Sequence, residues 1–454
     1  MSAGSNDLIV SVSGIRGIVG AGLTPGTVLA FAQALGTYLG VGPVVLSRDS
    51  RPSGDVLRHA VLAGLRASGC AVHDLGIAPT PTCGIAVRRL EAAGAIQITA
   101  SHNPAPWNGL KLFGSDGAVL SAAKGLEIKQ IFDAALFKSV RHDQLGGQHP
   151  CDDALAWHCD RVLEWIDGGR IRSRRFRTFL DANGGAGGPL GRNVLESLQG
   201  STPVLVGEEP DGNFAHPPEP LAENLQTILP LVPKAGADVG FVLDPDADRL
   251  AIVDENGRYI GEELTLALAV LCRLRHERRP VVINMSSSRV VEDIAHQFGV
   301  PCHRSAVGEA NVVERMRSSG ALIGGEGNGG VIDPRVGWVR DPFIGMALVL
   351  DLLAQTGQKL SEIVAGLPSY AIVKDKYEVP RDRLPQLNAA LQKRWPDARA
   401  NTLDGLRLDW PDRWVHVRPS NTEPIVRVIA EAPRATEAQR LCREMGELLR
   451  EPPA

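Results

Sequence analysis

Hydrophobic positions along the first 140 residues follow two periods in turn. Short β-branched runs at residues 44–46, 71–75 and 95–99 have the length of buried strands, and residues 55–68 and 82–90 repeat apolar positions at helical spacing. Strands that alternate with helices in this way are typical of βαβ units, in which the strands lie parallel. The pattern therefore predicts an α/β domain built on a largely parallel sheet.

A charged, glycine-rich passage at residues 141–150 ends this domain, and we place a domain boundary near residue 150. The same mixture of strand and helix periods then returns. The predicted helices here are 153–166, 263–274 and 289–298, and the predicted strands are 177–180, 240–243, its hairpin partner 250–254, and 281–284.

The pattern changes after Pro368, where strands and helices no longer follow a βαβ rhythm. The strands expected there are 370–379, 414–419 and 425–430, and the helices are 387–394 and 435–449. We therefore expect a smaller α+β domain at the C-terminus. The complete set of predicted domains is 1–150, 151–255, 256–369 and 370–454.

Composition and charge narrow the range of partners. With 44% hydrophobic and 22% charged residues among 454, the chain has the balance of a water-soluble protein of several domains. Lys and Arg total 48 against 52 Asp and Glu, so the net charge of −4 offers no electropositive field for a nucleic acid or a membrane surface. The seven scattered cysteines, and the lack of a signal sequence or a long apolar run, favour a reducing cytoplasm. We expect a small-molecule partner.

The sharpest chemical signal is the acidic loop DPDADR, which directly follows an apolar strand. Its alternate carboxylates, Asp244, Asp246 and Asp248, can converge on one divalent cation, and Mg²⁺ prefers such oxygen ligands. A solvated acidic turn is the alternative. A calcium-binding loop does not fit, because Arg249 occupies the position that requires glycine.

A serine in the segment TASHNP follows another predicted strand. Ligands of open α/β sheets bind at the carboxyl ends of strands, which is where Ser101 lies. Pro104 favours an extended conformation before it, and neighbouring side chains in an extended segment point to opposite sides. We therefore expect His102 not to activate Ser101, which taken alone is more typical of a turn or a helix cap.

Two further segments have the chemistry to contact a sugar phosphate. In GGEGNGG, residues 324–330, glycines let the backbone approach a ligand while Glu326 and Asn328 offer groups suited to hydroxyls, although a flexible turn is as typical. The segment RPSNTEP and the strand after it combine guanidinium, hydroxyl and amide groups, as a phosphate requires, or form a simple turn. Its candidate residues are Arg418, Ser420, Asn421, Thr422 and Arg427.

Other candidates are weaker. Isolated cations are most often surface residues, and this interpretation applies to Arg16, Arg48, Arg51 and Lys111 taken singly. The group Cys151, His158 and Cys159 lacks a second ligand pair at zinc spacing, so we interpret it as a helix surface with incidental thiols.

Together and in this order, the segments SGIRGIVG, TASHNP, DPDADR, GEGNGG and RPSNTEP resemble the α-D-phosphohexomutase superfamily from end to end. The resemblance implies three similar mixed-sheet α/β domains and a smaller C-terminal α+β domain around a central cleft. It implies an enzyme that moves phosphate between C1 and C6 of a phosphosugar through a 1,6-bisphosphate. The four domains would supply, in order, the phosphoserine, the metal site, the sugar site and the phosphate site.

The resemblance also implies roles for single residues. Ser101 would carry the phosphate, first received from a hexose 1,6-bisphosphate or a kinase. One Mg²⁺ per active site would lie on the three aspartates and Ser101, and Arg249 would hold phosphate oxygens. Lys111 would be the general base or acid, with its pKa lowered by Arg16. The sugar hydroxyls would be bound by Glu326 and Asn328, and the non-reacting phosphate by Arg418, Ser420, Asn421, Thr422 and Arg427.

One position departs from many bacterial members, whose sugar loop ends in Gly-His where this chain has Gly329 and Gly330. Other segments, SGIRG and DANGGAGG, lean toward the members that act on glucosamine phosphates, with phosphomannomutase/phosphoglucomutase as the close alternative. A phosphohydrolase using Ser101 and the metal is a competing class, although it has no need for a second phosphate site at Arg418. A non-catalytic sugar-phosphate sensor is another. The enzyme is expected to be a monomer or a homodimer.

Overall fold

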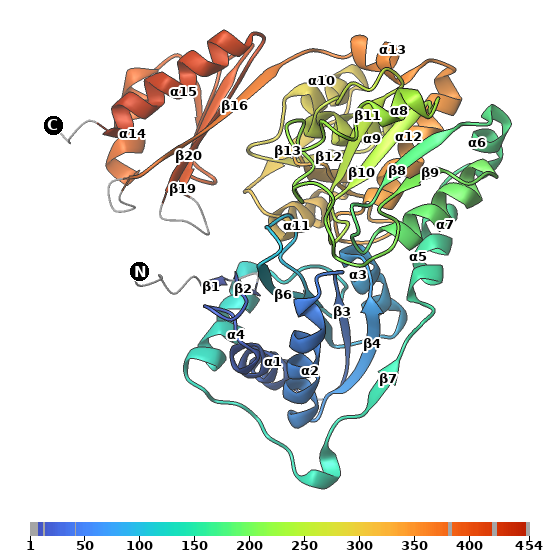
Figure 1. Ribbon diagram of the computed structural model, residues 1–454. Coiled ribbons are helices and arrows are strands. Elements are labelled where there is room, and N and C mark those ends of the chain that lie inside the picture. Colours follow the sequence, from blue (N-terminus) through green and yellow to red (C-terminus); the bar gives the residue numbers. More distant parts are fainter. Residues whose placement is uncertain (1–7, 12–13, 41, 380–383, 420–424, 451–454) are drawn as a thin grey trace.

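Three sheets with one shared topology follow one another along the chain. The computed structural model describes residues 8–11, 14–40, 42–379, 384–419 and 425–450 (Figure 1). In each sheet the first strand pairs in parallel with the second and third, and a fourth strand pairs antiparallel with the third. In sequence order the strands are β3 (Pro43–Arg48), β4 (Ala71–Ile77), β5 (Gly94–Ile98) and β6 (Trp107–Gly114); β8 (Thr178–Asp181), β9 (Val204–Val206), β10 (Val239–Leu243) and β11 (Leu250–Asp254); and β12 (Val281–Asn284), β13 (Cys302–Ser305), β14 (Ile323–Glu326) and β15 (Gly330–Ile332). The expectation of three similar mixed-sheet domains is confirmed.

The first sheet is the widest. Strands β1 (Ile9–Ser11) and β2 (Gly14–Ile18) extend it antiparallel beyond β6, and β7 (Gln148–Pro150) pairs in parallel with β4. Val44, Val45 and Leu46 of β3 are all fully buried, as expected for a strand covered on both faces. The helices of this part are α1 (Pro25–Leu39), α2 (Ser53–Ala67), α3 (Thr80–Arg89) and α4 (Ala122–Asp133), with a 3₁₀ turn η1 at His142–Gln144.

The second and third domains share one continuous hydrophobic core. Its centre is helix α12 (Pro342–Thr356), which is apolar on nearly every side and is buried from Pro342 through Leu353. Helix α12 packs against helices of both domains, including α6, α7 and α9. The remaining helices are α5 (Ala154–Leu163), α6 (Gly168–Arg174), α7 (Gly188–Gln199), α8 (Leu231–Lys234), α9 (Glu262–His276), α10 (Val290–Gln297), α11 (Glu309–Ser319) and α13 (Leu360–Ala365).

The C-terminal domain is a separate antiparallel sheet with its own core (Figure 1). Its strand order is β16 (Ala371–Tyr377), β20 (Val426–Ala432), β19 (Trp414–Pro419), β18 (Leu406–Asp409) and β17 (Arg399–Asn401), and its helices are α14 (Leu384–Arg394) and α15 (Ala435–Arg450). Several hydrogen bonds join it to the third domain, among them Ser286 Oγ to His416 Nδ1 at 3.0 Å and Val307 N to Asp404 Oδ2 at 3.0 Å. The expected α+β architecture is confirmed. Within the described residues, every helix is too short or too polar to cross a bilayer.

Candidate active site

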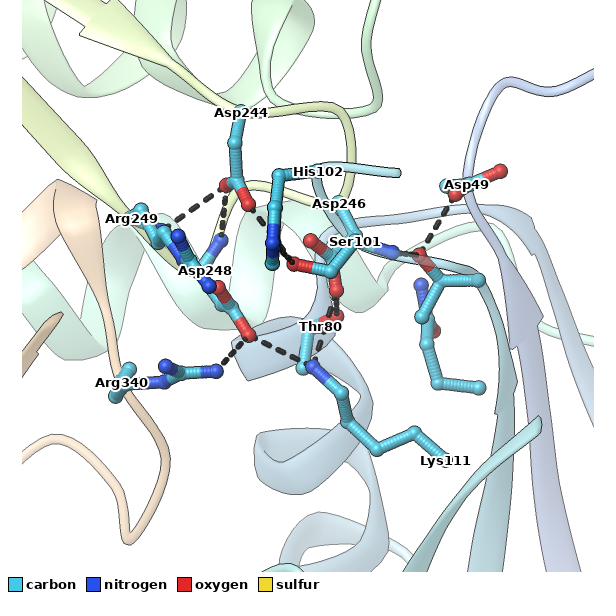
Figure 2. Close-up of polar contacts among 12 residues, drawn as sticks. Asp49, Thr80, Ser101, His102, Lys111, Asp244, Asp246, Asp248, Arg249 and Arg340 are labelled. Atoms are coloured by element: carbon cyan, nitrogen blue, oxygen red, sulfur yellow. Dashed lines mark hydrogen bonds and ion pairs between the residues drawn. The ribbon is translucent and has the colours of Figure 1, made fainter. Parts of the chain in front are cut away.

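The third strand of each α/β domain delivers one of the predicted signals to a common junction. Ser101 lies just after β5, Asp244 directly follows β10, and Glu326 ends β14. Because the three sheets have the same topology, these are equivalent positions at the carboxyl ends of strands, where α/β sheets bind ligands. The architectural repeat therefore brings together residues that lie far apart in the sequence, as Figure 2 shows for Ser101 and Asp244.

Ser101 lies in a tight turn, and its side chain faces the acidic loop (Figure 2). Its Oγ donates a hydrogen bond to Asp244 Oδ2 at 3.2 Å, across the junction of the first two domains. Its backbone is held from two sides: Thr99 Oγ1 accepts from Ser101 N at 2.8 Å, and Arg51 donates to the Ser101 carbonyl at 2.7 Å. The hydroxyl is therefore buried and fixed in direction.

This turn contradicts the expected placement of His102. Ser101 has a φ of 51°, in the left-handed region, so the segment is not extended there. His102 Nδ1 consequently lies 3.3 Å from Ser101 Oγ and not on the opposite side. Burial, together with Arg249 and Arg16, lowers the pKa of His102 to about 2. The imidazole is thus close enough to Ser101 to accept a proton but is a very weak base.

Arg51 is also not the surface cation that its isolated position suggested. It is fully buried, forms an ion pair with Asp49, and donates to the carbonyls of Ser101 and Asn103. The serine turn supplies acceptors that compensate the buried charge, and these acceptors come from a segment about 50 residues away. Arg48 remains partly exposed.

The three aspartates of the acidic loop form a fully buried cluster. The backbone N–H groups of Asp248 and Arg249 each donate to Asp244 Oδ1 at 3.0 Å, which curls the loop back on itself. One carboxylate oxygen from each aspartate lies within 4.8 Å of the other two. In the described part of the chain, Asp246 Oδ1 and Asp248 Oδ1 are buried without a hydrogen-bond partner. These oxygens are free to act as ligands of a hard divalent cation.

Burial and mutual repulsion set the protonation of this cluster. Burial, and then the charges of Asp246 and Asp248, raise the pKa of Asp244 well above its ordinary value. Burial acts in the same direction on Asp248, but Arg340 and Lys111 outweigh it and hold the pKa of Asp248 below its ordinary value. A cation on the cluster would relieve the repulsion that acts on Asp244.

Lys111 reaches the same cluster from β6. Its Nζ lies 2.7 Å from Asp248 Oδ2 and 3.1 Å from Asp246 Oδ2. Burial opposes its charge, but the two carboxylates raise the pKa of Lys111 above its ordinary value, so it is an ammonium. The expectation that Arg16 lowers this pKa is therefore wrong, because the carboxylates dominate. Arg16 instead donates to Asn103 Oδ1 at 2.9 Å.

Arg340 and Thr80 also lie at this junction, although neither was predicted from the sequence. Thr80 Oγ1 donates to Asp246 Oδ2 at 2.7 Å, and Arg340 makes the wider set of contacts. Its guanidinium donates to Asp248 Oδ2 at 2.5 Å and to Glu326 Oε2 at 3.1 Å, and its Nε lies 3.4 Å from Glu309 Oε2. Arg340 thereby joins the acidic loop to the glycine-rich loop at residues 324–330, which we call the sugar loop after its predicted role. The sequence offers only an indirect sign of its position. Arg340 directly precedes Asp341, which caps helix α12 by accepting from two backbone N–H groups.

The sugar loop is closely held around Glu326. Asn284 Nδ2 and the Gly308 N–H donate to Glu326 Oε1 at 2.9 and 3.0 Å. Asn328 Oδ1 is buried and, within the described residues, has no hydrogen-bond partner. At Gly330 an added Cβ would overlap the Cδ of Arg340, so this arginine occupies the space that a side chain at position 330 would need.

The remaining predicted residues are divided among several places. Arg249 pairs with Glu219 Oε1 at 3.3 Å. In the C-terminal sheet Arg418 of β19 lies opposite Arg427 of β20, and Arg418 Nε donates to Asp404 Oδ2 at 3.0 Å. Three predicted phosphate-binding residues lie outside the described residues: Ser420, Asn421 and Thr422.

The group around His158 is not a helix surface, contrary to expectation. His158 is fully buried and bonds Thr82 Oγ1 and Asp341 Oδ2, each at 2.8 Å, while Cys159 is buried beside it. The histidine thus links helix α3 of the first domain to the cap of helix α12. These partners come from distant segments, which the local sequence does not reveal.

Comparison with known proteins gives the same domain series along the whole chain. Family models described as phosphoglucomutase/phosphomannomutase match at residues 7–139 (alpha/beta/alpha domain I), 157–257 (domain II), 261–370 (domain III) and 373–448 (C-terminal domain). A "probable phosphoglucosamine mutase" of Methanopyrus kandleri is 36% identical and aligns over 96% of this chain and 97% of its own. A "phosphoglucomutase/phosphomannomutase" of Thermococcus kodakarensis is 35% identical over 95% of this chain and 96% of its own.

A solved structure agrees with these sequence matches. The crystal structure of a phosphoglucomutase/phosphomannomutase family protein from Burkholderia thailandensis superposes with a TM-score of 0.85 at 27% identity, covering 98% of this chain and 97% of the other. The expected resemblance is thereby confirmed. Over its whole length, the chain belongs to the phosphoglucomutase/phosphomannomutase family.

Proposed function

We propose that the protein is a phosphohexomutase that interconverts glucosamine 6-phosphate and glucosamine 1-phosphate. The observation that carries the proposal is the 3.2 Å contact of Ser101 Oγ with Asp244, which places a buried hydroxyl against a carboxylate cluster with open oxygen positions. A group-transfer serine needs a cation beside it, because the negative charge of a phosphoryl group must be compensated where it moves, and this carboxylate cluster has the open oxygens to hold one. A structural serine in a turn does not.

In the proposed reaction, phosphorylated Ser101 gives its phosphoryl group to the free hydroxyl of the phosphosugar. The bond from phosphorus to Oγ breaks as a bond to the sugar oxygen forms, the sugar hydroxyl loses a proton, and Oγ regains one. The resulting 1,6-bisphosphate reorients and returns its other phosphoryl group to Ser101, so no phosphate is lost. A hexose 1,6-bisphosphate or a kinase would prime Ser101 for the first cycle.

The chain's own cations support this transfer. We assign Lys111 to proton transfer: its raised pKa keeps it protonated, so it has a proton to return to Oγ, although the same shift makes it a weaker acid. Arg16 and Arg249, beside the same junction, would hold phosphoryl oxygens, as guanidinium groups do well. In the C-terminal sheet Arg418 and Arg427, with Ser420, Asn421 and Thr422, would bind the phosphate that does not react. Glu326 and Asn328 would contact the sugar hydroxyls.

The acidic cluster fits Mg²⁺. Its donors are all oxygens, two of them are buried without a hydrogen-bond partner in the described part, and Ser101 Oγ lies beside them. We propose that Asp244, Asp246, Asp248 and Ser101 hold one ion, which when bound would supply the positive charge that phosphoryl transfer requires.

Asp246→Asn is expected to weaken Mg²⁺ binding by more than about tenfold, the smallest loss typical of residues that only support a ligand, because it removes the charge of one ligand and keeps the side chain the same size. Isothermal calorimetry of Mg²⁺ binding measures this directly, and the Mg²⁺ dependence of turnover should shift by the same factor. Asp238→Asn, a substitution before β10 and outside the loop, is the matched control. An unchanged Mg²⁺ affinity in Asp246→Asn would contradict the assigned site.

The choice of an amino sugar rests on a pocket beside the sugar loop. A cavity of about 630 Å³ has four acidic residues in its lining, Glu219, Glu223, Glu262 and Glu263. Its basic lining residues are Arg258 and Lys374. Burial raises the pKa of Glu263 to about 8, and an ammonium beside it would favour its charged form. Glu262 is paired with Lys374 and Glu219 with Arg249. The remaining acids, Glu223 and Glu263, would suit the protonated amine of glucosamine better than the hydroxyl of glucose or mannose. The names of several archaeal relatives, each "probable phosphoglucosamine mutase" and 30 to 36% identical, support the same substrate.

Measured on one preparation, kcat/KM is expected to be highest for glucosamine 6-phosphate, compared with glucose 6-phosphate and mannose 6-phosphate. Each assay contains Mg²⁺ and a trace of the matching 1,6-bisphosphate. In Glu263→Gln the preference for the amino sugar should fall by about tenfold, the value of one lost charge-assisted contact, while the rate on glucose 6-phosphate changes little. A higher rate on glucose or mannose phosphate would favour the alternative, a phosphoglucomutase/phosphomannomutase like the Thermococcus kodakarensis relative.

A further inference from the structure

A second cluster of metal-binding side chains lies between helices α9 and α12, which pack against each other (Figure 1). Cys272 and His276 are one turn apart on α9, and Asp351 and Gln355 are one turn apart on α12. Residues four apart share a helix face, so the two pairs meet across the helix contact. None of these residues belongs to the proposed active site.

The ligand atoms have the spacing of a tetrahedral zinc site. Cys272 Sγ lies 3.5 Å from Asp351 Oδ2, and His276 Nε2 lies 3.2 Å from the same oxygen. Zinc bonds of about 2.3 Å to sulfur and about 2.0 to 2.1 Å to nitrogen and oxygen give tetrahedral edges of about 3.5 Å for S to O and about 3.3 Å for N to O. The sulfur, the nitrogen and the oxygen all lie within 4.8 Å of one another.

Hydrogen bonds hold the cluster together. The Cys272 thiol donates to Asp351 Oδ2, and Gln355 Nε2 lies 3.6 Å from Cys272 Sγ, 2.6 Å from His276 Nε2 and 2.8 Å from Asp351 Oδ2. The amide is held in this direction, because its Oε1 accepts from Arg275 at 3.1 Å. A zinc ion would displace the thiol proton on binding and replace the contacts that now converge on Asp351 Oδ2.

The charges and the exposure of the cluster also suit a metal ion. A thiolate and a carboxylate would neutralise a divalent ion, so the occupied site would carry no net charge into the buried helix contact. Arg170 lies 3.6 Å from the second oxygen of Asp351, as an outer partner of a carboxylate ligand does. Cys272 and Asp351 are buried, whereas the His276 side chain is 40% exposed and leaves a way in from solvent.

We infer that Cys272, His276 and Asp351 form a second metal site, of the zinc type, that joins helix α9 to helix α12. Thiolate, imidazole and carboxylate ligands favour Zn²⁺ or Co²⁺ over Mg²⁺, and three protein ligands leave the fourth position for water. This inference does not depend on the proposed mutase activity, since it uses other residues and another ion.

The test is a zinc titration of the chelator-treated full chain in excess Mg²⁺, against a chromophoric chelator. One Zn²⁺ per chain is expected, and the Co²⁺-loaded protein should show tetrahedral cobalt bands with a thiolate charge-transfer band. Cys272→Ala and His276→Ala should each weaken Zn²⁺ binding by more than about 100-fold, whereas Cys302→Ala and His296→Ala should not. Zn²⁺ should raise the Tm of the wild type but not of His276→Ala.

Because His276 is exposed, His276→Ala keeps the test informative even if Cys272→Ala fails to fold. Zinc binding that is unchanged in His276→Ala, or a cobalt spectrum without the thiolate band, would overturn the inference. So would the absence of saturable binding. Zinc binding that is lost in Asp246→Asn but kept in His276→Ala would place the ion on the acidic loop instead, and would overturn it equally.

Discussion

Ser101→Ala is expected to abolish mutase turnover, with kcat falling by about 10⁴-fold or more, as when a covalent nucleophile is removed. The substitution deletes one oxygen, the one that lies 3.2 Å from Asp244 and would carry the phosphoryl group. Intact mass spectrometry after incubation with a hexose 1,6-bisphosphate should detect one added phosphate on the wild type and none on the variant. A coupled assay for the 1-phosphate product measures the loss of turnover.

The fold of this variant should be preserved, because alanine and serine have similar access to the left-handed backbone at this turn and the side chain makes few other contacts. Ser115→Ala, an exposed position in the same domain, serves as the control and should keep full activity. If Ser101→Ala retained turnover, the phosphoserine mechanism would be wrong. If the wild type instead released one inorganic phosphate per sugar phosphate, the protein would be a phosphohydrolase.

The sequence was most informative where chemistry and local structure coincide. The loop of Asp244, Asp246 and Asp248 follows a strand whose every residue is buried. A few consecutive residues were therefore enough to predict both the strand and the acidic loop after it. Ser101 was found in the same way, at the end of β5, whereas Glu326 was found through its glycine-rich loop and the strand β14 that it ends was not predicted. The shared strand order of the three sheets was not readable, because different residues build the same topology without a repeated sequence.

Residues whose role depends on distant partners were misjudged or missed. Arg51 looked like a surface cation, yet it is buried against carbonyls of the Ser101 turn. His102 looked remote from Ser101 because Pro104 suggested an extended chain, but the positive φ of Ser101 turns the backbone before the proline acts. The pKa of Lys111 moved opposite to expectation, because carboxylates of another domain surround it. The errors at Arg51 and Lys111 concern contacts between segments that are distant in the sequence, whereas the error at His102 concerns a local backbone conformation.

Arg340 is the clearest of these cases, and we propose it as a positioning residue of the active site. It contacts three carboxylates, Asp248, Glu326 and Glu309, from two domains. An arginine fork that bonds Asp248 and Glu326 at once fixes the distance between the loop proposed to hold the metal ion and the loop proposed to bind the sugar. In its place a neutral side chain would leave neighbouring anions without their shared cation.

Arg340→Met is therefore expected to lower kcat/KM by about 100-fold or more, comparable to losing one preorganised donor at a reacting centre. It should also destabilise the protein by about 3 to 5 kcal/mol, because the buried carboxylates lose their counter-charge. Denaturant unfolding separates this loss from the kinetic one. Added guanidinium ion should restore part of the activity in Arg340→Ala, a rescue that a merely space-filling side chain would not allow. Arg335→Met, at a partly exposed arginine on the same segment, is the control and should stay near wild-type activity.

The glycine at position 330 gives an independent test of the same arrangement. Gly330→His alone should be strongly destabilised, since its Cβ would overlap the Arg340 side chain. Combined with Arg340→Ala, the histidine gains the vacated space, so the double variant should be more stable than the sum of the two single changes by about 1 kcal/mol or more. Additive effects on the free energy of unfolding would mean that the two positions do not compete for one space. Non-additive effects would instead show that the glycine at position 330 is needed because the Arg340 side chain fills the adjacent space.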